Sequence, residues 1–304
     1  PQIFHVDIPD DLAIQAIKLS PNQQKELRAI FQCDVVDRTG LILDIFALHA
    51  QSKEANLQVE LAMSVYLKPR LAGLGKTLNQ QGGGIGTRGP GEAKLETDSR
   101  LIDNRINKLR KELRKIEKQR VLQASSREKN NTPLVSIVGY TNAGKSTLLR
   151  SLTNSEAYVA DELFATVDSL QRELPIKNVQ EPLILSDTVG FIQNLPTTLI
   201  ESFKSTLLVA TSADLLIHVV DAATAIPQMH IGTVRNILEQ INVSANEIMV
   251  FNKIDRLDRA SLNELTERYP QALFISSLKN TGIEELVERI SSEIYGEVQQ
   301  DSFL

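Results

Sequence analysis

The residues most clearly suited to chemistry are those at 139–146, which read Gly-Tyr-Thr-Asn-Ala-Gly-Lys-Ser after an apolar run. Glycines at both ends let the backbone curl so that successive N–H groups converge on phosphate oxygens. The helix expected to follow adds the positive end of its dipole. In such a loop the lysine contacts the β- and γ-phosphates and the serine hydroxyl ligates Mg²⁺. The predicted phosphate-binding residues are Gly139, Tyr140, Thr141, Asn142, Ala143, Gly144, Lys145, Ser146 and Thr147.

A second motif, Asp-Thr-Val-Gly, occupies residues 187–190 at the end of another apolar run. Its aspartate can hold the water shell of Mg²⁺, and its glycine can offer an N–H to the γ-phosphate. Alone, Asp-x-x-Gly usually marks a turn. Its place after a predicted strand, downstream of the phosphate loop, favours a nucleotide site. The candidate residues here are Asp187, Thr188, Val189 and Gly190.

A third motif, Asn-Lys-Ile-Asp at 252–255, selects the base. The carboxylate of Asp255 can accept hydrogen bonds from the guanine N1–H and 2-amino group. Adenine lacks that donor pair and would leave the acid unpaired. A Ser-Ser-Leu run after the last predicted strand would supply backbone donors to guanine O6, although it is nearly uninformative by itself. The candidates are Asn252, Lys253, Ile254, Asp255, Ser276, Ser277 and Leu278.

A Leu-Phe-Ala-Thr-Val-Asp segment at 163–168 lies between the first two motifs. Its threonine could close over Mg²⁺ when the γ-phosphate is present and release it after hydrolysis; a surface-loop threonine is the alternative. The candidate nucleotide contacts are Phe164, Ala165, Thr166, Val167 and Asp168. The predicted metal ligands are Ser146 and Thr166, and the predicted catalytic residues are Lys145, Thr166, Asp187 and Gly190.

Phe191 stands directly after the Asp-x-x-Gly motif. Many GTPases place a glutamine there to orient the attacking water. A phenyl ring can neither donate nor accept a hydrogen bond from that water. We therefore expect slow intrinsic hydrolysis that a partner accelerates.

Residues 133–304 form the predicted domain that must position these motifs. Short apolar runs at 134–138, 183–185, 215–220, 248–251 and 273–275 predict buried strands, and helical periodicity marks 231–241 and 283–294. Near-continuous apolar strands suit a mostly parallel sheet covered on both faces. The fold class is therefore α/β, a doubly wound P-loop GTPase domain. A P-loop ATPase or kinase would share the first motif and lack Asn-Lys-x-Asp.

Residues 1–128 form a predicted first domain, followed by a polar linker at 129–132. Candidate strands at 2–6 and 33–36 predict a small α/β part over 1–50. Helices expected at 53–74 and 93–127, joined by a glycine-rich loop at 82–91, predict an antiparallel hairpin. A plain helical connector is the alternative. A heptad seam supports the hairpin: Ile102, Ile106, Leu109, Leu113 and Ile116.

The glycine-rich loop and the second helix predict an RNA-binding surface. The loop fits Gly-x-Gly-x-x-Gly but follows no strand and runs into Pro90, so a nicotinamide site is rejected; a flexible linker remains the alternative. Residues 100–120 include nine basic and three acidic residues, and this excess of positive charge favours contact with phosphates. The candidate RNA contacts are Arg88, Arg105, Lys108, Arg110, Lys111, Arg114 and Lys115.

Composition restricts the class of protein. The formal net charge of −5 excludes a uniformly basic nucleic-acid binder. From Pro133 onward the chain has 12 basic and 22 acidic residues, and before Pro133 it has 21 basic and 16 acidic residues. The single cysteine, Cys33, excludes an intramolecular disulfide. No apolar run reaches the roughly 18–20 residues of a membrane span. With no secretory leader visible, we expect a cytoplasmic monomer, and partial membrane association stays open.

Several motifs together resemble the HflX family of ribosome-associated GTPases. They are the phosphate loop through Thr147, Leu-Phe-Ala-Thr, Asp-Thr-Val-Gly-Phe-Ile, Asp-Arg-Thr-Gly-Leu-Ile-Leu-Asp at 37–44 and the glycine-rich stretch at 82–92. The resemblance spans about residues 33–290 and implies Mg²⁺-dependent hydrolysis of GTP to GDP and binding to ribosomal RNA of the large subunit. Some members split stalled ribosomes, so splitting, rescue or recycling is the implied role.

One residue departs from the pattern of that family. Ser169 stands where the family usually has proline, which affects the expected switch geometry. The alternative is an assembly GTPase of the Era or Obg type. Neither a KH-like Gly-x-x-Gly module after the GTPase domain nor a glycine-repeat amino-terminal fold is evident, which argues against both.

Overall fold

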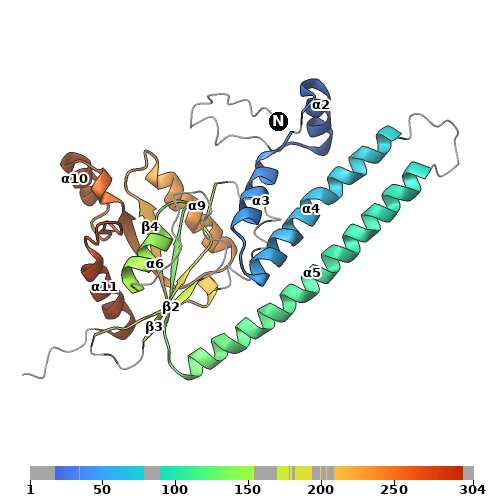
Figure 1. The fold of residues 1–304 in the computed structure, drawn as a ribbon. Helices are drawn as coiled ribbons and strands as arrows, with labels where there is room; N and C mark the ends of the chain where they lie inside the picture. Colours follow the sequence, from blue (N-terminus) through green and yellow to red (C-terminus); the bar gives the residue numbers. More distant parts are fainter. Residues whose placement is uncertain are drawn as a thin grey trace, which may run out of the picture. The chain divides into compact units, whose positions relative to one another are not determined.

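The computed structural model describes residues 18–33, 35–78, 90–153, 170–177, 179, 182–193, 199, 203 and 209–296 (Figure 1). The chain divides into two compact units. The first comprises residues 1–48 and 57–112, and the second comprises residues 49–56 and 113–304. Among the described helices, none combines the length and the apolar character needed to cross a lipid bilayer.

The second unit is built on a six-stranded sheet with the order β2-β3-β1-β4-β5-β6. Every neighbouring pair is parallel except β2 with β3, so the predicted doubly wound, mostly parallel sheet is confirmed. The strands are β1 (Leu134–Gly139), β2 (Gln171–Leu174), β3 (Leu183–Asp187), β4 (Leu215–Asp221), β5 (Asn246–Asn252) and β6 (Leu273–Phe274).

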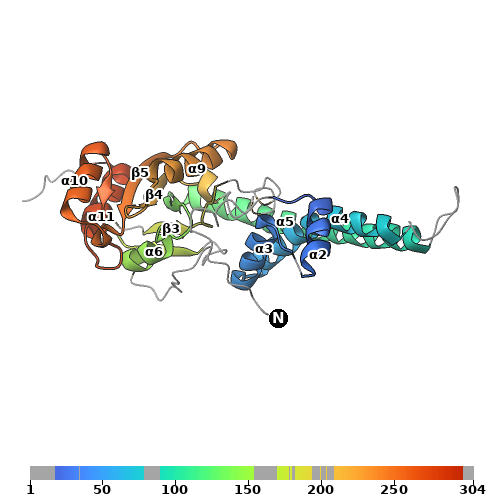
Figure 2. The same cartoon turned by 90° about the horizontal axis from the view of Figure 1, so that it is seen from above.

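Helices cover both faces of this sheet. On one face, α6 (Lys145–Thr153) and α11 (Ile283–Tyr295) share an apolar core with β1, β3 and β4. On the other, α9 (Pro227–Gln240) packs against β1 and β4, and α10 (Arg259–Arg268) packs with β5. A short 3-10 helix, η2 (Ile254–Arg256), follows β5. Figure 2 shows α9 and α6 on opposite sides of the strands.

The carboxyl ends of three parallel strands meet at one edge of the sheet. Strand β3 ends at Asp187, the adjacent β1 ends at Gly139, and β5 ends at Asn252. Strand β4 lies between β1 and β5. In open α/β sheets, ligands bind outside these ends, where the strand order reverses. The fold therefore brings three of the sequence motifs to the edge where a ligand is expected.

The described part of the first unit is helical. It contains α2 (Pro21–Phe31), α3 (Arg38–His49) and most of α4 (Lys53–Leu78), and it shares α5 (Pro90–Lys129) with the second unit. A reciprocal capping box between Ser20 and Gln23 begins α2. The candidate strand at 33–36 is wrong for its described residues, because 33, 35 and 36 lie in no strand. The other candidate strand, at 2–6, lies outside the described residues.

A buried carboxylate explains that local structure. Asp37 is 2% exposed and caps α3 by accepting the Gly40 N–H at 2.8 Å. It also accepts the Tyr66 hydroxyl at 2.7 Å and pairs with Arg70 at 2.8 Å. Burial, followed by the hydrogen bond to Asp37, raises the pKa of Tyr66 to about 12. The Asp-Arg-Thr-Gly motif thus fastens α3 to α4.

The long helices α4 and α5 lie side by side as a hairpin in both ribbon views (Figures 1 and 2). The predicted seam is apolar and turned inward: Ile106 and Leu109 are buried, as are Val59 and Ala62 on α4. Ion pairs that join the two helices are Lys68–Asp103 and Arg105–Glu60. The glycine-rich loop predicted between the helices lies outside the described residues up to position 89.

Candidate nucleotide-binding site

The loop between β1 and α6 has the conformation that its glycines predict. Gly144 has φ 92°, in the left-handed region that favours glycine. A Cβ there would overlap the side-chain nitrogen of Asn252. Asn142 is also left-handed, at φ 59°, and asparagine tolerates this region better than most residues. The backbone therefore curls just before the first turn of α6, where N–H groups are open to a ligand.

Lys145 lies at the start of α6 with its ammonium turned back into the loop. Its Nζ donates to the carbonyl of Tyr140 at 3.0 Å, and the residue is 6% exposed. Burial lowers the pKa of Lys145 to about 8, a change that Asp187 opposes and Lys253 reinforces. The geometry thus holds a desolvated ammonium ready to pair with an anion.

A pH prediction follows from that pKa. Because phosphate favours the charged form, binding must return a proton to Lys145 once the free protein loses it above pH 8. We expect GDP affinity to fall about six- to sevenfold between pH 7.0 and 8.8. Calorimetry at pH 8.5 in two buffers of different ionisation enthalpy should reveal proton uptake. Binding without proton uptake would contradict the assignment.

Asp187 and Ser146 face each other at the same edge. The Ser146 hydroxyl donates to Asp187 Oδ2 at 2.7 Å. The Asp187 side chain, including its other oxygen Oδ1, is buried. The next residue is fixed too, since the Thr188 hydroxyl donates to the Ile137 carbonyl at 2.8 Å. Hydroxyl and carboxylate oxygens suit Mg²⁺. Among the described residues, no group of three or more His, Cys, Asp or Glu side chains could hold a metal ion.

Gly190 lies directly against the phosphate loop. A Cβ there would come within 2.9 Å of the Thr141 Cα and 3.2 Å of Lys145 Nζ. The following residue, Phe191, is 1% exposed and packs in the apolar core with Val138 and Leu216. The phenyl side chain therefore fills the core below the loop. This position offers no polar group to an attacking water.

The Asn-Lys-x-Asp motif joins the phosphate loop to the last predicted motif. Asn252 Nδ2 donates to the Ala143 carbonyl at 3.0 Å, and its Oδ1 accepts the Ser277 N–H and hydroxyl, each at 3.0 Å. Lys253 Nζ donates to the Asn142 carbonyl at 2.7 Å and pairs with Asp221 at 2.8 Å. The side chains of Asn252 and Lys253 thus connect three segments: the phosphate loop, the turn at Ser277 and the end of β4 at Asp221.

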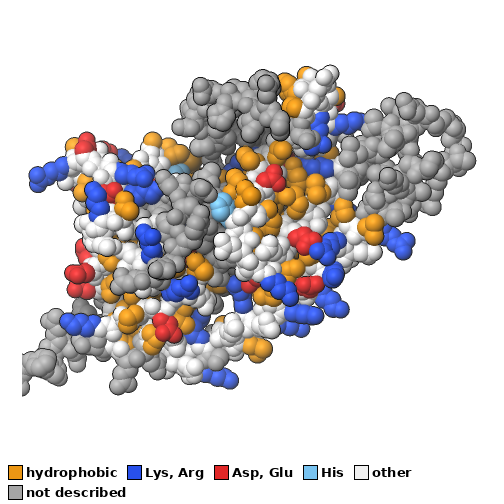
Figure 3. Space-filling view, in the orientation of Figure 1, with side chains coloured by type: hydrophobic (Ala, Val, Ile, Leu, Met, Phe, Trp, Pro, Cys, Tyr) orange, Lys and Arg blue, Asp and Glu red, His pale blue; other side chains and the backbone are white. Residues whose placement is uncertain are grey.

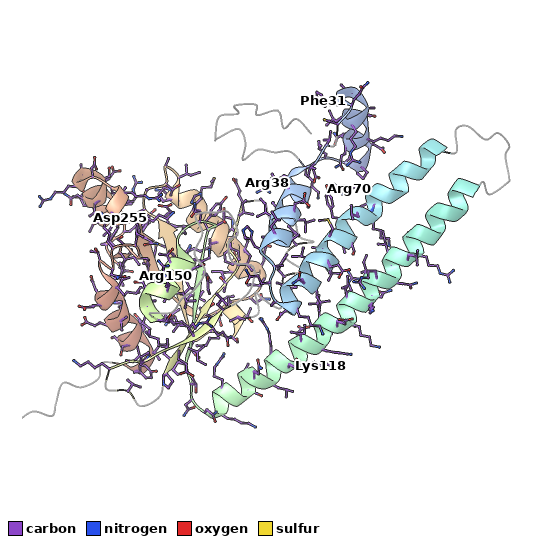
Figure 4. The ribbon with its side chains drawn as sticks, in the orientation of Figure 1. Phe31, Arg38, Arg70, Lys118, Arg150 and Asp255 are labelled. Atoms are coloured by element: carbon purple, nitrogen blue, oxygen red, sulfur yellow. The ribbon has the colours of Figure 1, made fainter. Side chains whose placement is uncertain are left out.

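Asp255 lies at the rim of this arrangement (Figure 4). Its Oδ1 accepts the Ser276 hydroxyl at 2.6 Å, and that bond is the main cause that lowers the pKa of Asp255. Ser276 is held in turn by reciprocal backbone bonds with Thr281. Leu278 is 70% exposed. A charged, partly exposed carboxylate beside a serine-rich turn can accept two hydrogen bonds from a planar base.

The structure qualifies some predicted contacts. Ala143 and Val189 are buried and Ile254 packs against the core, so only their backbone groups could reach a ligand. The predicted switch residues at 164–168 and Arg88 lie outside the described residues. Sequence reasoning missed Asp221, which pairs with Lys253, because an aspartate at a strand end carries no signal of its own.

The basic residues of α5 form an exposed surface away from the seam. Seven of its basic side chains are exposed: Arg100, Lys108, Arg110, Lys111, Arg114, Lys115 and Lys118. Figure 3 shows Lys and Arg side chains along this helix, and Figure 4 labels Lys118. Arg105 is also exposed but is engaged by Glu60. The predicted cluster of positive charge is therefore accessible, apart from one member that pairs within the hairpin.

The sheet order, the phosphate loop and the Asn-Lys-x-Asp motif define the second unit as a P-loop GTPase domain. Three family profiles match the chain: "GTP-binding GTPase N-terminal" over residues 7–47, "GTP-binding GTPase Middle Region" over 49–127 and "50S ribosome-binding GTPase" over 134–253. The profile boundary at 127 falls just before the predicted linker.

Relatives and solved structures agree. The chain is 47% identical to GTPase HflX of Caldanaerobacter subterraneus, covering 97% of this chain and 68% of the relative. It is 45% identical to GTPase HflX of Escherichia coli K12, covering 93% and 67%. A GTP-binding protein from Sulfolobus solfataricus, solved with GDP, matches with TM-score 0.53 and 30% identity over 92% of this chain and 79% of that one. The chain belongs to the HflX family of GTPases, enzymes that hydrolyse GTP, and spans about two thirds of these two HflX relatives.

Proposed function

We propose that the chain binds GTP and GDP with Mg²⁺ at the carboxyl edge of its sheet and couples hydrolysis to the large ribosomal subunit. The observation that carries the nucleotide site is the Asn252 side chain, which ties the phosphate loop to Ser277. The phosphate loop and the Asp255 carboxylate proposed to bind the base are thereby held in fixed positions relative to each other. The relative solved with GDP supports the choice of ligand.

Each residue has a proposed part in the reaction. Lys145 turns from the Tyr140 carbonyl to the β- and γ-phosphates. Ser146 would ligate Mg²⁺, with Thr166 as the second protein ligand from the switch segment, and Asp187 would hold the metal's water shell. When bound there, the ion would supply positive charge against the negative charge that develops on the phosphate oxygens. Gly190 offers its N–H to the γ-phosphate.

Hydrolysis is proposed to be slow until a partner completes the site. The buried phenyl ring of Phe191 leaves no side chain there to orient water. A group supplied in trans, such as an arginine, can accelerate such a reaction by roughly 10³–10⁵-fold. The profile described as a 50S ribosome-binding GTPase supports the large subunit as that partner.

The basic surface of α5 is proposed to contact ribosomal RNA. Lysines and arginines at helical spacing suit a phosphate backbone, and their accessibility in the structure supports the assignment. Arg105 is a weaker candidate because it pairs with Glu60. Arg88 and the glycine-rich loop remain proposed contacts from sequence. Ribosome splitting, rescue or recycling is the proposed role.

Single-turnover hydrolysis tests this function. The full chain is mixed with radiolabelled GTP and Mg²⁺, with and without purified large subunits, and phosphate release is timed. We expect an acceleration of at least about 10²-fold with large subunits, because the water-orienting group is then present. Small subunits serve as the control partner. Equal rates with and without large subunits would refute a ribosome-completed site.

The RNA surface is tested by removing two charges that lie one helical turn apart. We expect Lys111→Gln with Lys115→Gln to weaken co-sedimentation with large subunits and to reduce the slope of log affinity against log salt by about 1 for each phosphate that is no longer neutralised. Arg172→Gln with Lys177→Gln removes two exposed charges from the GTPase domain and is the matched control. The same reduction of slope in both double variants would refute a specific role for α5.

A further inference from the structure

Tyr140 joins three elements around the phosphate loop. Its ring stacks on His230 of α9, with centroids 3.9 Å apart and planes at 8°. Its hydroxyl accepts the backbone N–H of Gln193 at 3.1 Å, and its carbonyl accepts Lys145 Nζ. One side chain of the loop therefore touches both a helix of the opposite layer and the segment that follows Gly190.

The same segment is paired to the loop through its backbone. The Phe191 N–H donates to the Gly139 carbonyl at 3.1 Å, and the Thr141 N–H donates to the Phe191 carbonyl at 2.7 Å. Residues 191 and 193 are thus both fixed to the loop, one by backbone bonds and the other by the tyrosine hydroxyl. Gly190 immediately precedes these two residues, so the contacts restrain its position from the C-terminal side.

The stack on His230 keeps the tyrosine in place. A flat, closely spaced pair of rings restricts the rotation of the phenol, so the hydroxyl stays aimed at Gln193. Phe191 adds an anchor beneath, since its ring is buried in the core with Val234 of the same helix α9. Helix α9 therefore supports the segment from two sides.

We propose that Tyr140 is a positioning residue that fixes the Gly190 N–H for the γ-phosphate and so favours GTP over GDP. This inference rests on the proposed nucleotide site, in which Gly190 meets the γ-phosphate. GDP lacks that phosphate and gains nothing from an ordered Gly190. A group that is already fixed in its bound position loses no conformational entropy when the ligand binds.

The test uses Tyr140→Phe in the full chain, which keeps the ring and removes the acceptor. Dissociation constants are measured with Mg²⁺ for fluorescent GDP and for a non-hydrolysable GTP analogue. We expect the constant for the analogue to rise about 3–10-fold, as for the removal of one hydrogen bond, and the constant for GDP to stay within about twofold. Tyr269→Phe removes a hydroxyl elsewhere in the same unit and should change neither constant.

A second pair of variants tests the support of the ring. His230→Ala should weaken analogue binding in the same selective way, and His230→Phe should restore it because a stacked ring returns. An equal change in both constants for Tyr140→Phe, or no change in either, would overturn the inference alone. A wild-type chain that binds neither nucleotide would overturn the proposed function and the inference with it.

Discussion

Replacing Lys145 with alanine is expected to abolish nucleotide binding at micromolar concentrations. In the proposed site this lysine is the charge that meets the phosphates, and it is already desolvated in the structure. Truncating one partner of a buried charge pair costs about 2–5 kcal/mol, which corresponds to a decrease of roughly 30- to 5,000-fold in affinity. Titration of the full chain with fluorescent GDP and with a GTP analogue measures the decrease for both nucleotides.

The variant should remain folded, which separates a binding defect from a folding defect. Alanine removes a buried ammonium together with its bond to the Tyr140 carbonyl, so a desolvation cost disappears along with one hydrogen bond. Thermal unfolding, monitored by circular dichroism, tests whether the variant is folded. Lys177→Ala, at an exposed position on the same unit, is the matched control and should bind like the wild type. Near-normal GDP binding by folded Lys145→Ala would refute the phosphate assignment.

The local motifs were predictable because each depends on a few adjacent residues. A glycine pair around polar residues after an apolar strand specifies a tight loop, and Gly144 indeed has a left-handed backbone. The heptad seam likewise predicted the buried Ile106 and Leu109. In such cases hydrophobic period and backbone freedom decide the structure, and both are readable from neighbouring positions.

The errors and omissions arose where distant contacts decide. Val35 and Val36 have high strand propensity, but the adjacent Asp37 is drawn into a network with Arg70 and caps a helix instead. Strand β2 was missed because three of its four residues are exposed and polar, and it exists by pairing with β3. A propensity is a weak prior when tertiary contacts compete with it.

The assembly of the site was only partly predictable for the same reason. Strand order and motif order placed the loops at one edge of the sheet. They did not reveal that Asn252 bonds to Ala143, or that His230 stacks on Tyr140. These contacts join residues that are far apart in sequence, and no sequence pattern around either residue indicates which partner it will contact. The stack of His230 on Tyr140 is the one on which the proposed discrimination between GTP and GDP depends.

Replacing Asp255 with asparagine is expected to shift the preference from GTP towards XTP. In the proposed site the carboxylate accepts hydrogen bonds from guanine N1–H and from the 2-amino group. An amide can accept only the first and turns an NH₂ towards the second. A hydrogen bond to a charged group contributes about 1.5–3 kcal/mol, so we expect GTP affinity to fall roughly 10–100-fold. Xanthine has a carbonyl in place of the 2-amino group, and that oxygen can accept from the new amide.

The frame around position 255 should survive this change. The Ser276 hydroxyl can donate to an amide oxygen as it does to the carboxylate, so the serine turn keeps its contact. Competition of unlabelled GTP, XTP and ATP against fluorescent GDP, or against fluorescent XDP for the variant, measures the preference. The same bond lowers the pKa of Asp255, so the wild-type preference for GTP should persist when the solution is acidified towards the ordinary carboxyl range. An unchanged GTP-to-ATP ratio in the variant would show that another group reads the base.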